Sequence, residues 1–198
     1  MTTLNTSFYT QKGPTCMVAA ARMVISGFEI PPSQNDLSRS IPIWPDGIYA
    51  FDLAQELEKR GWSVLIFAGP PEAIARLIEA GYSAIAMIKS VQGRHSVAVT
   101  GAERLSNPKN QTQCSSALYR LLVNDPNESK AKWITAREFE ASESDQQAIV
   151  IFKPDDYVKL SANGFPIEIA KKVDRRFRAQ TLSMRWTVCH KAFPISSG

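Results

Sequence analysis

Residues 11–24 read QKGPTCMVAAARMV, a turn through Gly13-Pro14 that leads directly into an apolar segment. Apolar residues recur at helical spacing from Thr15 to about Phe28, which predicts a buried helix with Cys16 in its first turn. A helix N-terminus carries about half a positive charge and unpaired backbone N–H groups, which stabilise a thiolate and leave donors for an oxyanion. The sequence therefore predicts a nucleophilic thiol at Cys16, although free cysteine is also often a buried core residue.

A histidine at the start of an apolar strand is the predicted base. Residues 93–101 read GRHSVAVTG, in which His95 alternates with Val97 and Val99. An imidazole that takes the thiol proton forms a thiolate–imidazolium pair. The alternative is a hydrogen-bonded histidine in the core or at the sheet edge. The catalytic reading is favoured because the chain has only two histidines, and the other, His190, follows a cysteine in a tail without a clear pattern.

A carboxylate to orient this base is expected at the end of the next strand. Residues 121–126 read LLVNDP, which makes Asp125 the natural candidate. The neighbouring Asn124 offers the same orienting role with a neutral amide, and successive strand residues point to opposite faces, so only one of the two reaches His95. An aspartate before Pro126 is also a common turn residue.

Gln11 is the predicted oxyanion donor. It stands five residues before Cys16, where the Gly13-Pro14 turn can fold its side-chain amide back beside the thiol. A polar surface glutamine is the alternative.

The remaining cysteines and histidine show no metal-binding pattern. Cys114, Cys189 and His190 lack the paired spacing of zinc sites. The chain contains no Walker loop, no Gly-x-Gly-x-x-Gly after a strand and no His-Glu-x-x-His. We therefore expect no metal and no cofactor.

The order of the predicted elements is helices first and sheet second. Ser33 with Asp36 predicts a cap for a short second helix, and Asp46-Gly47 predicts the start of a third that runs to Arg60-Gly61. The later part is predicted to contain strands over 62–68, 82–89, 95–100, 118–124 and 148–152, helices over 71–80 and 135–141, and a hairpin loop over 105–116.

Composition indicates one globular domain. The chain has 198 residues, 44% of them hydrophobic and 21% charged, which are ordinary values for a protein with a packed core. No apolar run reaches membrane-spanning length, the start lacks signal-peptide features, and three unevenly spaced cysteines fit a reducing compartment, so we expect synthesis in the cytoplasm. The net charge of +4 resides mainly after Lys153, in a segment that a solvated basic helix explains without a nucleic-acid partner.

Taken in order, these motifs resemble the C39 and C39-like peptidases of the papain-like superfamily. The resemblance implies an α+β, papain-like fold in which an N-terminal helical lobe packs on an antiparallel β-sheet lobe. It implies a peptidase domain over residues 1–153 and a basic extension over 154–198 packed on the same domain. It also implies that Cys16, His95, Asp125 and Gln11 act as nucleophile, base, orienter and oxyanion donor.

The implied activity is that of a cysteine peptidase which hydrolyses peptide or protein substrates through an acyl-enzyme. The alternatives are an acyltransferase or transglutaminase-like enzyme that uses the same thiol, and an inactive peptide-binding domain. The setting is either a housekeeping enzyme or a toxin or effector exported without a signal peptide, the latter with an inhibitor or immunity protein as partner. One departure from the family is Met17, where a glycine commonly follows the cysteine; it is expected to add bulk near the scissile bond.

Overall fold

The computed structural model describes residues 1–45, 47–68, 70–90, 93–105 and 119–162. Three helices precede most of the sheet: α1 (Cys16–Ile25), α2 (Gln34–Ser40) and α3 (Ala50–Lys59). The predicted hairpin loop, apart from Leu105, and the tail with its predicted basic helix lie outside the described residues, as do Cys114, Cys189 and His190. Within the described chain, the α+β fold with a helical lobe on an antiparallel sheet is confirmed.

The first two helices begin where the sequence predicts. In α1 every residue except Cys16 and Arg22 is buried, which explains why its sequence is apolar on nearly all sides. The α2 helix has Ser33 as its cap, and the Ser33 hydroxyl accepts a hydrogen bond from the Asp36 backbone N–H (3.1 Å).

The third helix begins later than predicted, at Ala50 and not next to Asp46-Gly47. The reason is a closed turn that precedes it. Trp44 and Gly47 exchange two backbone hydrogen bonds of 2.8 and 2.9 Å, so these residues are already paired with each other and cannot join the helix.

In the described part of the chain the sheet has seven strands, and every pairing between them is antiparallel. Its order is β2-β7-β3-β4-β5-β6, and β1 pairs with β4 just beyond the first residue of β3, on the same edge of β4. The strands are β1 (Thr2–Thr3), β2 (Ser63–Ala68), β3 (Ala84–Ser90), β4 (Gly93–Arg104), β5 (Tyr119–Asn124), β6 (Lys132–Thr135) and β7 (Glu143–Phe152). Sequence patterning missed β1 and β6, because short strands carry little alternation of apolar residues, and it placed the start of β7 too late, because residues 143–147 (ESDQQ) are polar.

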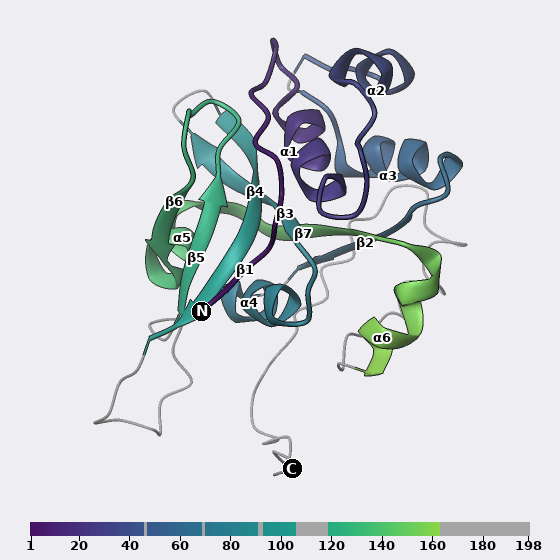
Figure 1. Ribbon diagram of the computed structural model, residues 1–198. Coiled ribbons are helices and arrows are strands. Elements are labelled where there is room, and N and C mark those ends of the chain that lie inside the picture. Colours follow the sequence, from purple (N-terminus) through teal and green to yellow (C-terminus); the bar gives the residue numbers. More distant parts are fainter. Residues whose placement is uncertain (46, 69, 91–92, 106–118, 163–198) are drawn as a thin grey trace.

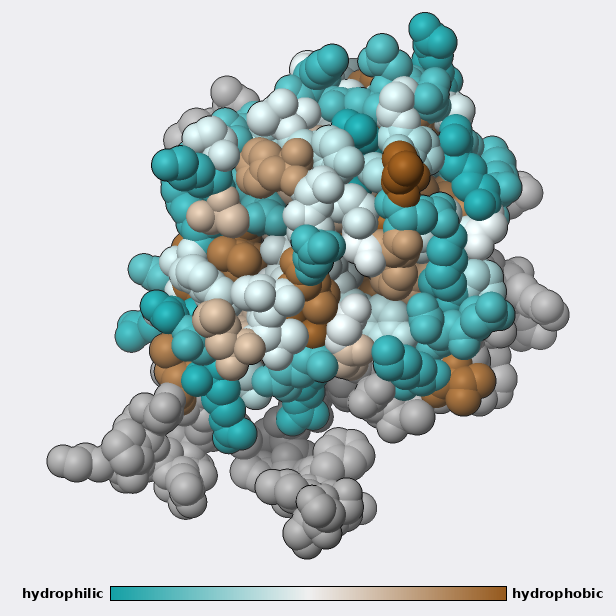
Figure 2. Space-filling view, in the orientation of Figure 1, coloured by the Kyte–Doolittle hydropathy of each residue, from teal (hydrophilic) through white to brown (hydrophobic). Residues whose placement is uncertain are grey.

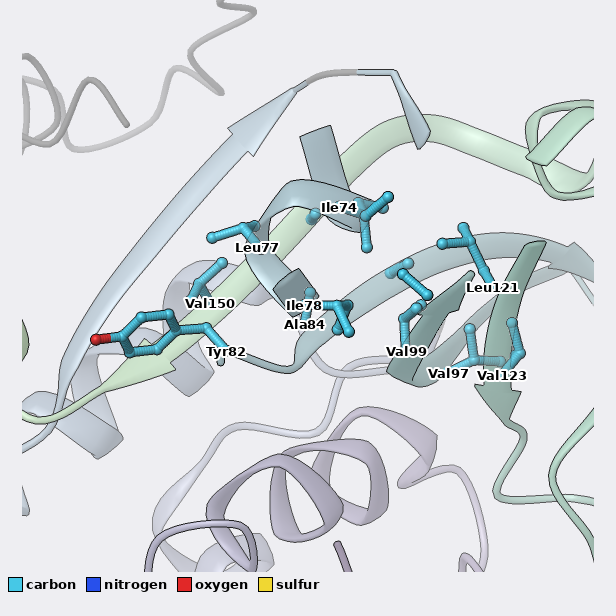
Figure 3. Packing of buried hydrophobic residues seen from close by; sticks show 14 of the residues in the cluster. Ile74, Leu77, Ile78, Tyr82, Ala84, Val97, Val99, Leu121, Val123 and Val150 are labelled. Carbon is cyan, nitrogen blue, oxygen red and sulfur yellow. The ribbon is translucent and has the colours of Figure 1, made fainter. Parts of the chain in front are cut away.

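Alternate residues of the strands face two separate cores. Ile85, Met87 and Ala98 pack with the helical lobe formed by α1, α2 and α3. Val97 and Val99, on the opposite face, pack with α4 (Pro71–Glu79) and α5 (Ala136–Ser142). Figure 1 shows the helical lobe and α4 on opposite sides of the sheet, and Figure 3 shows α4 side chains over β4 and β5. The sheet is therefore buried on both faces.

The end of the described chain is attached to the rest of the fold. The Lys153 ammonium lies 2.6 Å from the Glu29 carboxylate and 3.7 Å from the centre of the Trp62 ring. A short 3-10 helix (Pro154–Asp156) and α6 (Tyr157–Ala162) follow, and Leu160 is buried in the same core as α4. The predicted extension thus begins in contact with the domain, and residues 163–198 lie outside the described chain.

The described part of the chain contains no helix that could span a membrane. None of its helices is both long and apolar enough to cross a bilayer. On the face seen in Figure 2, hydrophobic residues occur as separate spots among polar ones.

At Gly101 both β5 and β1 pack closely against β4, so this position provides a test of the arrangement. A Cβ atom at Gly101 would lie 2.8 Å from Leu122 Cβ and 3.2 Å from the Thr2 carbonyl oxygen. We expect Gly101→Ala to lower the free energy of unfolding by about 2 kcal/mol, because the contact with a backbone-anchored Cβ cannot relax without a strand shift. Urea denaturation measures the change. Gly27→Ala, whose Cβ would meet nothing closer than 3.4 Å, is the control and should have a smaller effect; equal midpoints for the two variants would contradict the close approach.

Candidate active site

Cys16 is the first residue of α1, and α1 packs against β4 of the sheet. Its thiol is half-buried. The preceding residue, Thr15, occupies the N-cap position, yet its side chain caps no backbone N–H of the first turn. The N-terminal N–H groups of α1 therefore keep their positive potential beside the thiol.

His95 lies on β4 between the thiol and a carboxylate. Its side chain hydrogen-bonds the Cys16 thiol, and its Nε2 atom lies 2.6 Å from Asp125 Oδ1. Since Nε2 faces Asp125, the other ring nitrogen, Nδ1, is the one left for the thiol. Asp125 Oδ1 also accepts a hydrogen bond from the Asn127 backbone N–H (2.8 Å), which fixes the carboxylate in its turn. Cys16, His95 and Asp125 thus form one connected set of contacts.

The two residues that the sequence offered as partners for His95 have different contacts. Asn124 is the last residue of β5, and its amide nitrogen donates to the Thr100 hydroxyl (3.0 Å). Asp125 follows the strand and reaches the imidazole. The alternation of side chains along β5 therefore assigns the contact with His95 to the carboxylate.

For Cys16, His95 and Asp125, charge and hydrogen bonding shift the pKa in the direction opposite to the effect of burial. Burial raises the pKa of the Cys16 thiol, but hydrogen bonds with His95 and the Ser96 backbone together lower it by more than burial raises it. The pKa of this thiol therefore lies below its ordinary value. Burial lowers the pKa of His95, but hydrogen bonds with Asp125 and Cys16 raise it to about 9. Burial raises the pKa of Asp125, and hydrogen bonds from His95 and Asn127 reverse this to a net decrease. The site thus favours a thiolate beside an imidazolium.

Ser96 contacts the thiol, and sequence reasoning missed it. It is almost completely buried, and both its backbone and its hydroxyl contact Cys16. The hydroxyl can also donate its single proton to Met87 Sδ (3.2 Å). Strand β5 ends opposite Ala98, so it does not cover the part of β4 that carries Ser96. The sequence contains one signal for this role: Ser96 is a small polar residue between His95 and the apolar residues that follow it.

Gln11 lies in the loop that leads into α1, but its side chain is not in the set of contacts around the thiol. Its amide nitrogen donates to the Gly13 carbonyl (3.2 Å), and the backbone N–H of Gln11 donates to the Pro126 carbonyl (3.1 Å). Gly13 has a φ of +69°, which allows the tight turn. The Gln11 Oε1 atom is buried without a hydrogen-bond partner among the described residues. The structure therefore joins the Gln11 loop to the turn that carries Asp125.

Met17 does not lie where the resemblance implied. Its side chain is only 1% exposed and packs in the core of the helical lobe with Leu37 and Leu53. The expectation that Met17 adds bulk near the scissile bond is therefore wrong, because the helix turns this residue away from the thiol and into the core. Within the described ranges, no group of three or more metal-binding side chains gathers at the site or elsewhere.

The reactivity of Cys16 toward iodoacetamide tests the contact with His95. Only the thiolate reacts, so wild-type labelling should persist below the free-thiol pKa of ~8.5 and decline as the pH falls through the lowered pKa of Cys16. Removing the imidazole leaves burial to raise this pKa. We expect His95→Ala to reduce the labelling rate at about pH 6 by at least tenfold, since one pKa unit changes the thiolate fraction about tenfold.

Mass spectrometry of the peptide that contains Cys16 measures this rate separately from labelling at the other two cysteines. Cys16→Ser supplies the background. Identical pH profiles for the wild type and His95→Ala would contradict a thiolate–imidazolium pair.

The Ser96 hydroxyl should make a smaller contribution to the same rate. Ser96→Ala removes a hydroxyl that can turn its single proton from Met87 Sδ to the thiolate, and it keeps the backbone N–H, so we expect labelling of Cys16 at about pH 6 to fall up to about fivefold. Ser40→Ala removes a hydroxyl that bonds the Asp36 carbonyl on α2 and serves as the matched control. If both variants label like the wild type, the hydroxyl does not stabilise the thiolate.

Comparison with known proteins shows the family to which the chain belongs. Three solved structures have TM-scores of 0.57 with this chain. A double glycine motif protease from an AMS/PCAT transporter, solved in complex with the leader peptide, has 15% sequence identity, and the match covers 77% of this chain and 94% of that one. The peptidase domain of Streptococcus ComA, a bifunctional ABC transporter of a quorum-sensing pathway, has 16% identity with coverage of 75% and 99%, and a candidate C39-like peptidase from Bacillus anthracis has 14% identity with coverage of 77% and 98%. None of the curated proteins matches the sequence. Residues 3–148 match the Peptidase_C39 like family, and the chain therefore belongs to that family.

Proposed function

We propose that this protein is a cysteine peptidase that hydrolyses peptide bonds with Cys16, His95 and Asp125 as its catalytic residues. The observation that carries the proposal is the set of contacts from the Cys16 thiol through His95 to the Asp125 carboxylate, with Nε2 of His95 2.6 Å from Oδ1 of Asp125. A thiol, an imidazole and a carboxylate in this order constitute the arrangement that nucleophilic catalysis requires.

In the first half of the proposed reaction, the Cys16 thiolate attacks the carbonyl carbon of the scissile peptide bond. The carbonyl oxygen becomes an oxyanion, which the backbone N–H of Cys16 stabilises at the N-terminus of α1. Gln11 is the second proposed donor, since its amide nitrogen has one hydrogen directed to Gly13 and a second that no described residue accepts. The tetrahedral intermediate then collapses, the C–N bond breaks, and the His95 imidazolium gives its proton to the leaving amine.

In the second half, water hydrolyses the thioester that links the substrate to Cys16. Neutral His95 takes a proton from the water, and the resulting hydroxide attacks the acyl carbon. The C–S bond breaks, the carboxylic acid leaves and the thiolate–imidazolium pair returns. Asp125 keeps Nε2 of His95 protonated throughout, so Nδ1 stays available for these proton transfers.

A peptide substrate is supported by the family and by one of the solved structures. The chain belongs to a peptidase-like family, and the double glycine motif protease of similar fold was solved in complex with a leader peptide. The double-glycine specificity named for that protein is not part of the proposal.

The experiment that tests the proposal is digestion of a proteome-derived peptide library in ¹⁸O-labelled water, with a primary amine added as a competing acceptor. Hydrolysis puts one ¹⁸O atom into the new carboxyl terminus, whereas transfer to the amine adds the mass of the acceptor. We expect ¹⁸O-labelled products from the wild type, and turnover at least about a thousandfold lower for Cys16→Ala and His95→Ala.

Each other outcome selects a different function. Amine adducts without ¹⁸O-labelled acids would identify an acyltransferase or transglutaminase-like enzyme. Peptides retained by the wild type without any product would identify a peptide-binding domain. Cleavage that survives in Cys16→Ala would rule out the proposed nucleophile.

A further inference from the structure

A buried glutamine on α2 contacts the loop that leads to the thiol. Gln34 is only 6% exposed and is the first residue of α2. Its amide is oriented so that donors meet acceptors: Oε1 accepts from the Thr15 hydroxyl (2.5 Å) and the Lys12 backbone N–H (2.8 Å), and Nε2 donates to the Thr10 carbonyl (3.2 Å). A single side chain therefore binds three points of the loop over residues 10–15.

Two of these three points flank Gln11. The Thr10 carbonyl lies on one side of Gln11 in sequence and the Lys12 N–H on the other, so both adjoining backbone groups are fixed to Gln34. On the sheet side, the Gln11 N–H donates to the Pro126 carbonyl (3.1 Å). The backbone around Gln11 is thus held from the helical lobe and from the turn that carries Asp125.

The third point is the N-cap of α1. An N-cap threonine commonly accepts a hydrogen bond from a first-turn N–H, and Thr15 does not. Its single hydroxyl proton lies between two acceptors, Oε1 of Gln34 (2.5 Å) and the Lys12 carbonyl oxygen (2.8 Å). Gln34 therefore also keeps the cap oxygen of Thr15 off the N-terminus of α1, where the Cys16 N–H is located.

We propose that Gln34 is a positioning residue for oxyanion stabilisation: its amide holds the loop over residues 10–15 so that the Cys16 N–H and the Gln11 side chain can face one developing oxyanion. This inference rests on the proposed function, because it concerns the same reaction. It assigns Gln34 no contact with the substrate and no effect on the charge of the thiol.

Two small probes separate these contributions at Cys16. p-Nitrophenyl acetate acylates a thiolate through a tetrahedral oxyanion, whereas iodoacetamide alkylates it by direct displacement without one. Release of p-nitrophenolate gives the first rate, and mass spectrometry of the Cys16 peptide assigns both reactions to this residue. The ratio of acylation to alkylation, divided by the wild-type ratio at the same pH, reports oxyanion stabilisation apart from thiolate formation.

Gln34→Glu is the most informative variant because it keeps the shape of the side chain. Ionised, the introduced carboxylate repels the Thr10 carbonyl; protonated, it donates to that carbonyl and accepts from the other two partners, as the amide does. We expect the normalised ratio to fall about tenfold or more at about pH 8 and to recover toward the wild-type value as the carboxyl is protonated near pH 5. The alkylation rate should stay within about twofold, which also shows that the site is folded.

Two further variants keep the inference testable. Gln34→Met loses all three hydrogen bonds and should give a low ratio at every pH, and Thr15→Val removes one partner and should lower the ratio less. Gln55→Glu places the same new charge on an exposed position of α3 and should leave the ratio unchanged.

The failures of the two proposals are distinguishable. If neither probe reacts with Cys16 in the wild type, the proposed function falls. If the wild type reacts with both and Gln34→Glu keeps the wild-type ratio at about pH 8, or loses acylation and alkylation equally at every pH, Gln34 does not position the oxyanion donors.

Discussion

The hydrogen bond between the Cys16 thiol and His95 is the interaction on which the site depends, because burial by itself would keep this thiol neutral. It connects α1, which belongs to the helical lobe, with β4, whose two faces contribute to both cores. The packing of α1 on the sheet therefore does more than bury apolar surface. It brings the positive end of a helix, a thiol and an imidazole to the same place, and Asp125 holds the imidazole there through a second hydrogen bond of 2.6 Å.

The loop over residues 10–15 is the second constraint. Its backbone must bring Gln11 near the N-terminus of α1 while its own polar groups find partners, since buried N–H and C=O groups without partners are costly. Gln34 supplies partners from the helical lobe, and the Pro126 carbonyl supplies one from the sheet lobe. The same hydrogen bonds that satisfy the loop also join it to the turn that carries Asp125, so the position of the loop and that of the carboxylate are linked.

Sequence patterns predicted α1 and the three residues that the structure brings into contact, and the family resemblance predicted a helical lobe packed on an antiparallel sheet lobe. The helix and the three residues could be predicted because a turn before an apolar helix and a polar residue at the end of a strand are visible in short stretches of sequence. The contacts of Ser96 and Gln34 with the site are not local: each depends on how α1 and α2 pack, and no spacing in the chain reveals it. Met17 was misplaced for the same reason, since the side of α1 that meets the core is decided by tertiary packing. The choice between Asn124 and Asp125 needed the register of β5 with β4.

The order of these residues along the chain has a consequence for synthesis. Cys16 leaves the ribosome with the first helix, whereas the strand that carries His95 and the turn that carries Asp125 are made much later. Until both have joined the sheet, the thiol lacks the hydrogen bonds from His95 and Ser96 that lower its pKa, and the cysteine is less nucleophilic than in the folded protein. The hydrogen bonds that favour a thiolate at Cys16 are therefore complete only after the last of these segments has joined the sheet.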